Sequence, residues 1–120
     1  MTEPDEPSAT VAALPPEDAK LVTLARATRA RVGAAEGAAV RDTDGRTYAA
    51  ATVDLPSLRL SALAVCVAMA VSSGSRGLEA AVLLTAAEAA TEADLAALAD
   101  LGGPDVVVHL LDPLGRPSSR

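Results

Sequence analysis

A run of almost exclusively apolar residues near the middle of the chain constrains the fold most. The run begins at Leu60 and ends at Val71, contains no charged residue, glycine or proline, and is followed by Ser72, Ser73 and Gly74. These properties predict a helix over residues 60–71 that stops at the Ser-Ser-Gly sequence. Apolar residues cover every face of this helix, so we expect other elements or another subunit to enclose it. A membrane-spanning helix needs roughly 20 apolar residues, and this run is too short.

The small apolar side chains of the sequence favour association with further copies. The 120 residues suffice for one domain and half of them are hydrophobic, but Phe and Trp are absent and Tyr48 is the only tyrosine. A core built from Ala, Val and Leu buries little area per side chain. We therefore expect a homo-oligomer, a dimer or a tetramer, that associates through the apolar helix from Leu60 to Val71. A different protein partner is also compatible with this composition.

Charge and cysteine content bound the partners and the compartment. The net charge of −6 argues against nucleic-acid binding, which depends on clustered Lys and Arg. Lys20, Arg26, Arg29 and Arg31 lie close together, but the solvated face of one helix explains them. No membrane partner is expected. The single cysteine, Cys66, cannot form an internal disulfide, and the acidic, proline-containing N-terminus is unlike a signal peptide, so we expect a cytoplasmic protein.

The sequence predicts one domain between two short tails. Residues 1–15 combine Pro, Glu and Ser and are expected to be a flexible tail, residues 16–115 form the domain, and residues 116–120 are expected to be a flexible C-terminus. A helix over residues 16–32 is expected, because a Pro-Pro pair suits its start. Its apolar face contains Leu21, Leu24, Ala25 and Thr28 at helical spacing.

A hairpin and a loop are expected to follow. Residues 37–40 and 46–53 are predicted to form two strands around the Asp44-Gly45 turn, a strong hairpin signal. Residues 54–57 are expected to form a loop, with Ser57 as the N-cap of the central helix.

The remainder alternates strands with helices. A buried strand is predicted over residues 78–85, a helix over residues 91–101 with Thr91 as its cap, and a further strand over residues 105–111. Strands that alternate with helices pair in parallel through right-handed crossovers. The predicted fold class is therefore α/β, a three-layer αβα sandwich with a mixed sheet.

This order of elements resembles that of the nucleoside cytidine deaminases between Leu21 and Gly115. The resemblance lies in three segments: Glu36-Gly37-Ala38-Ala39-Val40 at the first strand, Asp44-Gly45-Arg46-Thr47-Tyr48 in the hairpin, and Ala70-Val71-Ser72-Ser73-Gly74 at the end of the central helix. These are framework residues, so they imply a cytidine deaminase-like fold more than they imply its chemistry.

The resemblance implies a zinc site at the starts of two helices. Such enzymes hold one ligand and a proton-transferring Glu in Cys-Ala-Glu or His-Ala-Glu at the start of the central helix. They hold two further ligands in Pro-Cys-x-x-Cys at the start of the next helix. Here Ser61-Ala62-Leu63 takes the first place and Ala90-Thr91-Glu92-Ala93-Asp94 the second. A register two residues later, Leu63-Ala64-Val65, supplies no ligand either. Ser61, Leu63, Thr91 and Asp94 are thus degenerate equivalents, and no catalytic residue or metal ligand is assigned.

Other candidate residues have simpler explanations. The ribose-binding Asn-x-Glu of the family falls on Thr52-Val53-Asp54, which makes Asp54 and, more weakly, Thr52 substrate-binding candidates, although a loop aspartate is commonly a turn residue. Partial burial explains His109, and core packing explains Cys66. A solvated helix face explains four acidic residues, Glu88, Glu92, Asp94 and Asp100.

Three functional hypotheses follow from these residues. The first is a catalytically inactive, zinc-free homologue that acts through oligomerisation, ligand binding or partner binding, with no cofactor. The alternative is an active cytidine deaminase, converting cytidine to uridine with zinc at a diverged site. The third is a structural module that only shares the fold. A polar pocket between the two helix starts would favour catalysis, whereas Ser61, Thr91 and Asp94 bonded to one another would favour the first hypothesis.

Overall fold

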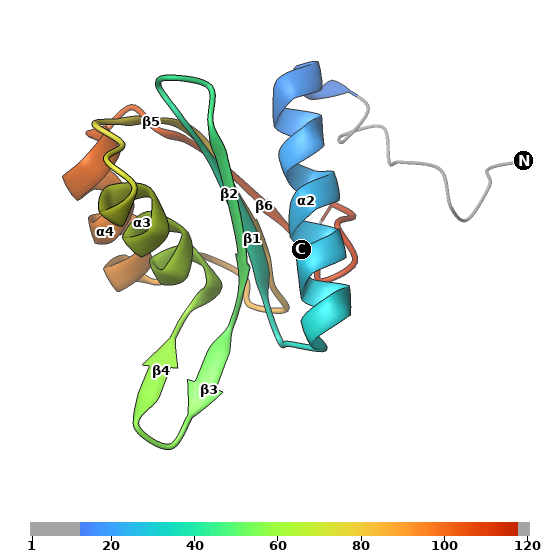
Figure 1. The fold of residues 1–120 in the computed structure, drawn as a ribbon. Helices are drawn as coiled ribbons and strands as arrows, with labels where there is room; N and C mark the ends of the chain where they lie inside the picture. Colours follow the sequence, from blue (N-terminus) through green and yellow to red (C-terminus); the bar gives the residue numbers. More distant parts are fainter. Residues whose placement is uncertain (1–12, 118–120) are drawn as a thin grey trace, which may run out of the picture.

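The computed structural model describes residues 13–117 of the chain. Of the two predicted tails, residues 1–12 and 118–120 lie outside the described part of the chain. The elements run in the order α2 (Pro16–Val32), β1 (Gly37–Asp42), β2 (Thr47–Ala51), β3 (Val53–Leu55), β4 (Leu58–Leu60), α3 (Ala62–Ser72), β5 (Leu78–Leu84), α4 (Glu92–Gly102) and β6 (Val107–Leu111), as Figure 1 shows.

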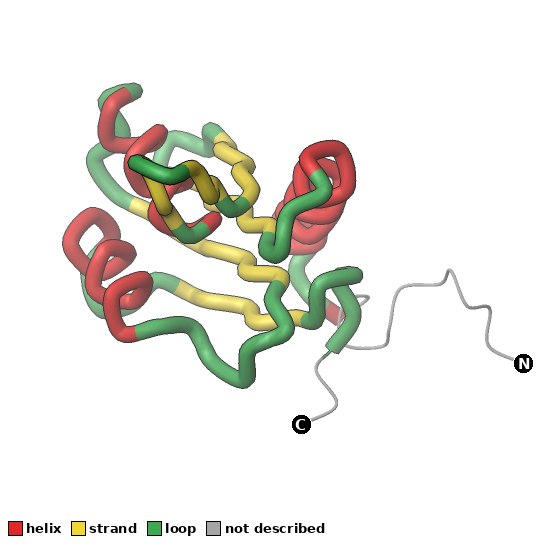
Figure 2. The backbone as a smooth tube through the Cα atoms, turned by 90° about the horizontal axis from the view of Figure 1, so that it is seen from below, coloured by secondary structure: helices red, strands yellow, loops and turns green. Residues whose placement is uncertain are grey.

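A four-stranded mixed sheet forms the middle layer. Its strand order is β2-β1-β5-β6, in which β1 pairs antiparallel with β2 and β5, and β5 pairs parallel with β6. Helix α2 covers one face, and α3 and α4 cover the other (Figures 1 and 2). The predicted α/β fold with helices on both faces of a mixed sheet is confirmed.

The two faces of the sheet bury separate hydrophobic clusters, because successive strand residues point to opposite faces. Ala39 and Val82 pack with Leu21 of α2, whereas Ala38 and Val40 pack with α3 and α4. The buried stripe of α2 consists of Asp18, Leu21, Val22 and Ala25. The expectation that Leu24 belongs to this stripe is wrong, since its side chain is 37% exposed.

The first hairpin forms at the predicted turn. Gly45 has a φ of +86°, a conformation that favours glycine. The Oδ1 atom of Asp42 accepts hydrogen bonds from the backbone N–H groups of Asp44 and Arg46, and its Oδ2 atom accepts one from the Ser75 hydroxyl. These bonds lower the pKa of Asp42 although burial alone would raise it. They also allow Asp42 to be fully buried at the end of β1. The strand ends there, two residues beyond the expected end at residue 40.

A second hairpin replaces the expected loop over residues 54–57. β3 and β4 pair antiparallel, with Val53 opposite Leu60 and Leu55 opposite Leu58, and the hairpin extends away from the main sheet (Figure 1). Helix α3 consequently begins at Ala62 instead of Leu60. Its N-cap is Ser61, so the assignment of that role to Ser57 is wrong.

The central helix α3 is enclosed on only part of its surface. Ala62, Leu63, Cys66 and Ala70 are buried, whereas Val71 is 54% exposed. The elements within residues 13–117 therefore do not cover every face of this charge-free helix. We expected enclosure either by other elements of the chain or by another subunit, and among the described residues the first is incomplete. Enclosure by another subunit stays a prediction. Among the helices in residues 13–117, none is long and apolar enough to cross a membrane.

Candidate functional site

The starts of α3 and α4 meet at two side-chain caps. The Ser61 hydroxyl accepts a hydrogen bond of 3.1 Å from the backbone N–H of Ala64, and the Thr91 hydroxyl accepts one of 3.1 Å from the backbone N–H of Asp94. Each cap satisfies one of the four N–H groups that a helix N-terminus leaves unpaired. The expected cap at Thr91 is confirmed, and the two helices have equivalent starts.

The Asp94 carboxylate joins these two helix starts. The Ser61 hydroxyl donates a hydrogen bond of 2.6 Å to the Oδ1 atom of Asp94, and Asp94 is only 5% exposed. A hydroxyl bonded to a buried carboxylate is a strong, charge-assisted contact. The position of Asp94 in the first turn of α4 also favours a negative charge there. Its expected place on a solvated helix face is wrong, although Glu88, Glu92 and Asp100 are exposed as expected.

Leu63, the position on α3 where the resemblance expects a glutamate, belongs to the hydrophobic core. Leu63 is fully buried in the cluster between the sheet and α3. One turn further on, Cys66 is also fully buried, and its thiol donates a hydrogen bond to the backbone carbonyl of Tyr48. Burial raises the pKa of the Cys66 thiol to about 12, which leaves it protonated and unreactive at neutral pH. The predicted core role of Cys66 is confirmed.

The residues at the two helix starts do not fit a zinc ion. Zinc in proteins is held by Cys, His, Asp or Glu, and catalytic sites use three such ligands. Of the three expected ligand positions, only Asp94 has a side chain of this kind, because Ser61 and Thr91 are hydroxyl residues. Across residues 13–117, no cluster of three or more His, Cys, Asp and Glu side chains is placed to hold a metal ion. The side chains of Ser61, Thr91 and Asp94 therefore suit hydrogen bonding at the two helix starts and do not form a zinc site.

Of the two substrate-binding candidates, Thr52 lies just before the second hairpin and Asp54 lies on the hairpin itself. Thr52 bonds to the backbone of Glu36, from which its hydroxyl accepts an N–H hydrogen bond of 2.9 Å. Asp54 lies on β3, where its exposed carboxylate pairs with Arg59 at 3.4 Å. The structure thus brings Ser61, Thr91 and Asp94 together, but gives Thr52 and Asp54 other partners.

A partly buried network of charged and polar side chains lies on the opposite face of the sheet and was not predicted from the sequence. The Asp18 carboxylate lies 2.9 Å from Arg41 Nη2 and 2.9 Å from His109 Nε2, and Arg41 Nε lies 2.9 Å from Glu79. Burial raises the pKa of Asp18, but the hydrogen bonds from His109 and Arg41 outweigh it and leave that pKa below its usual value. The partial burial expected for His109 is confirmed, and its partner on α2 explains it.

The comparisons with known proteins place these features in a family. A family model described as "Cytidine deaminase-like" matches residues 14–115. Among solved structures, the cytidine deaminase from Burkholderia pseudomallei is 22% identical with a TM-score of 0.67, and the match covers 77% of this chain and 84% of that one. The cytidine deaminase from Mycobacterium tuberculosis is 24% identical with a TM-score of 0.64, covering 74% and 80%.

The cytidine deaminase from Mycobacterium leprae is 22% identical with a TM-score of 0.63, and the match covers 78% of this chain and 86% of that one. At these identities the likeness shows the shared fold alone. No curated protein matches the chain.

Proposed function

Because the chain belongs to the cytidine deaminase-like family, we propose that it is a catalytically inactive, zinc-free member that acts through oligomerisation and through binding of a ligand or a partner. The observation that carries this proposal is the 2.6 Å hydrogen bond between Ser61 and Asp94. It joins two of the three positions at which the resemblance expects zinc ligands. The two side chains are therefore bonded to each other at positions where a zinc site would need both of them as ligands.

Leu63 supports the same conclusion from the chemistry of proton transfer. Hydrolytic deamination needs a carboxylate that moves protons to and from the substrate, and the resemblance expects it at this position. The Leu63 side chain has no exchangeable proton and is fully buried. Thr91, the third ligand equivalent, is engaged as a helix cap.

The decisive experiment measures zinc and turnover on the same preparation. The chain is expressed with zinc supplied, purified without a metal-binding tag, and analysed for zinc per chain and for conversion of cytidine to uridine. We expect neither. About one zinc per chain together with turnover, in a chain with native Ser61, Thr91 and Asp94, would overturn the proposal in favour of an active deaminase.

A matched variant checks the assay. Replacing all three ligand equivalents together, Ser61→Cys, Thr91→Cys and Asp94→Cys, supplies the thiolates that a structural or catalytic zinc site uses. This variant is expected to retain zinc, which shows that the starts of α3 and α4 are close enough to share one ion. It is not expected to turn over cytidine, because Leu63 remains.

Oligomerisation is proposed to use the outer face of α3. The helix carries no charged residue over Ala62–Ser72, and Ala68 and Val71 on it are exposed. Light scattering should report a dimer or tetramer that Val71→Glu dissociates. The control is Val32→Glu on α2, which is similarly exposed at 57% and lies on the other side of the sheet. A monomeric native chain would contradict this part of the proposal.

The proposal also includes a cytoplasmic location and excludes nucleic acids and membranes as partners. The chain has one cysteine, which is buried and free, and its net charge of −6 opposes binding to a phosphate backbone.

A further inference from the structure

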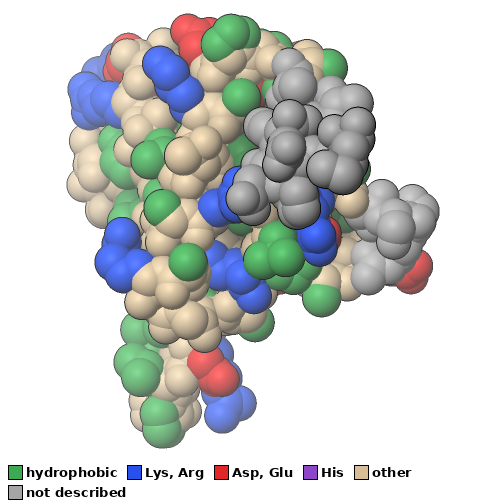
Figure 3. All heavy atoms as spheres, turned by 90° about the vertical axis from the view of Figure 1, so that its right-hand side faces the viewer, with side chains coloured by type: hydrophobic (Ala, Val, Ile, Leu, Met, Phe, Trp, Pro, Cys, Tyr) green, Lys and Arg blue, Asp and Glu red, His purple; other side chains and the backbone are tan. Residues whose placement is uncertain are grey.

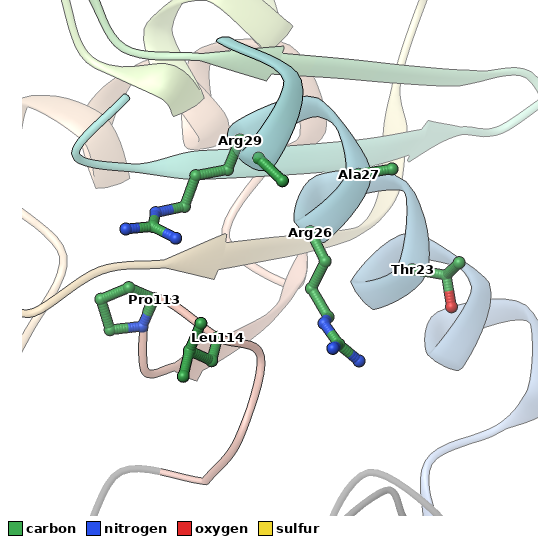
Figure 4. Close-up of a pocket in the computed structure, with 7 residues that line it drawn as sticks. Thr23, Arg26, Ala27, Arg29, Pro113 and Leu114 are labelled. Atoms are coloured by element: carbon green, nitrogen blue, oxygen red, sulfur yellow. The ribbon is translucent and has the colours of Figure 1, made fainter. Parts of the chain in front are cut away.

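A groove lies between α2 and the turn that follows β6, on the side of the sheet opposite the Ser61–Asp94 contact. Its volume is about 360 Å³. Helix α2 contributes Thr23, Arg26 and Arg29, and the turn contributes Pro113 and Leu114 (Figure 4). In the close-up, the two arginine side chains leave α2 on the side that faces Pro113 and Leu114.

The turn is ordered by its own hydrogen bonds and packs against α2, where it forms one wall of the groove. The Asp112 carboxylate accepts backbone hydrogen bonds from Leu114 and Arg116, both at 2.9 Å. A Cβ atom added at Gly115 would lie 2.6 Å from Cδ of Arg26, which means that the glycine packs directly on the arginine stem. Leu114 nevertheless stays 52% exposed, which leaves an apolar surface beside the two guanidinium groups.

The two guanidinium groups are short of partners. The Arg26 guanidinium makes no hydrogen bond or ion pair with any residue in the range 13–117. The Arg29 guanidinium makes one, from its Nε to the backbone carbonyl of Ala35 at 3.3 Å. No residue that lines the groove is acidic. Figure 3, which faces α2, shows hydrophobic side chains flanked by Lys and Arg on this surface. In a chain of net charge −6, such a groove is selective for a negatively charged occupant.

We propose that this groove binds an acidic, proline-containing peptide, and that its occupant is the segment around Glu3, Asp5 and Glu6 of the same chain. Residues 1–12 contain three acidic residues and no Lys or Arg. Pro4 and Pro7 fix φ near an extended conformation, which reduces the entropy lost on binding. The segment complements the groove in charge and supplies the carboxylates that Arg26 and Arg29 lack.

The length of the segment matches the position of the groove. Arg26 and Arg29 lie ten and thirteen residues beyond Pro16, which corresponds to roughly 15 and 20 Å along the helix axis. An extended chain spans about 3.3 Å per residue, so Glu6 reaches roughly 23 Å from Ala13 and Glu3 roughly 33 Å. The three acidic residues can therefore lie beside the two arginines when the segment runs back along α2.

The test uses a paramagnetic label on the full chain. A nitroxide is attached at Thr2→Cys, since buried Cys66 does not compete for the reagent. The amide NMR signals of residues 23–30 are compared before and after the nitroxide is reduced. We expect roughly half of their intensity to be lost at low salt, because exposed ion pairs are individually weak and hold the segment for part of the time. The intensity should return in about 1 M NaCl, where the Debye length is about 3 Å.

Paired variants assign the effect to the groove. Arg26→Gln with Arg29→Gln should restore full intensity, whereas Arg59→Gln with Arg76→Gln removes the same charge from other surfaces and should leave the loss in place. Equal intensities in the oxidised and reduced native chain would overturn the proposal. So would a loss that persists without Arg26 and Arg29, or one that appears on isotope-labelled chains mixed with separate nitroxide-bearing chains, which would identify a second copy as the occupant.

Discussion

The hydrogen bond between Ser61 and Asp94 predicts an unequal effect of two otherwise similar substitutions. Ser61→Ala removes the cap of α3 and also the bond to Asp94. Thr91→Ala removes only the cap of α4. The two caps have the same donor–acceptor distance of 3.1 Å, so Thr91→Ala serves as the internal control.

The expected magnitudes follow from the two contacts. Loss of a side-chain N-cap lowers the free energy of unfolding by about 0.5–2 kcal/mol. A hydrogen bond to a charged group contributes about 1.5–3 kcal/mol, and Asp94 is too buried for water to replace it fully. Thr91→Ala should therefore cost about 0.5–2 kcal/mol and Ser61→Ala about 2–5 kcal/mol.

Urea denaturation followed by circular dichroism measures both effects, at one protein concentration because association would shift the apparent stability. A double-mutant cycle with Asp94→Ala isolates the contact, since that change leaves the Thr91 cap in place, and the coupling energy should be about 1.5–3 kcal/mol. A metal chelator should leave both the free energies of unfolding and the coupling energy unchanged. A coupling energy near zero, or equal effects of Ser61→Ala and Thr91→Ala, would refute the view that this bond ties α3 to α4.

Three further predictions concern Asp18, Cys66 and the close packing at Gly102. Asp18→Asn should lower the free energy of unfolding by about 1.5–3 kcal/mol at neutral pH. Because the folded pKa of Asp18 lies below its ordinary value of 3.8, this contribution is present above pH 3.8 and is lost as the pH falls through the folded pKa; a difference that stays constant into acid would contradict it. The Cys66 thiol should react with a thiol reagent only after denaturant is added, and rapid reaction of the native chain would show that α3 opens. Gly102→Ala places a Cβ atom 2.3 Å from Cγ2 of Val106 and should cost about 1–3 kcal/mol in thermal or urea unfolding, with partial recovery when Val106→Ala is added.

Local sequence signals were sufficient for most of the fold. The Pro-Pro pair and acidic first turn predict the observed start of α2, and the Asp44-Gly45 pair predicts the first hairpin turn. These features act within a few residues of one another, so a single sequence contains all the information that they need. The same holds for the cap of α4 at Thr91.

The second hairpin was missed because two patterns overlap. Val53, Leu55, Leu58 and Leu60 alternate with polar positions on either side of a two-residue turn, which is a strand signal. The last of these leucines also continues into the apolar run of the central helix, and Pro56 favours a loop. Asp54 and Arg59 face each other across the register, and this pairing could have separated the hairpin from the helix.

The contacts that distinguish the site depend on long-range packing. Asp94 and Ser61 are 33 residues apart, and Asp18 and His109 are 91 residues apart. Neither pair has a local signature, because an aspartate in the first turn of a helix is equally consistent with an exposed position. The sequence therefore predicts that Ser61 and Asp94 are equivalents of ligand positions, but the fold was needed to show that they bond to each other.

Ser61, Leu63 and Asp94 at the two helix starts each make contacts that a zinc site would have to replace, so we expect that no single substitution creates one. Ser61→Cys or Asp94→Cys supplies one thiolate and removes the present hydrogen bond between α3 and α4. Leu63→Glu restores a carboxylate but loses about 2–3 kcal/mol of apolar burial and adds the cost of desolvating a charge in the core. Against a typical total stability of about 5–15 kcal/mol, each change is a large loss without a functional gain. Each single variant should therefore unfold at lower urea concentration than the native chain and retain no zinc, and a stable, zinc-binding Ser61→Cys chain would contradict this reasoning.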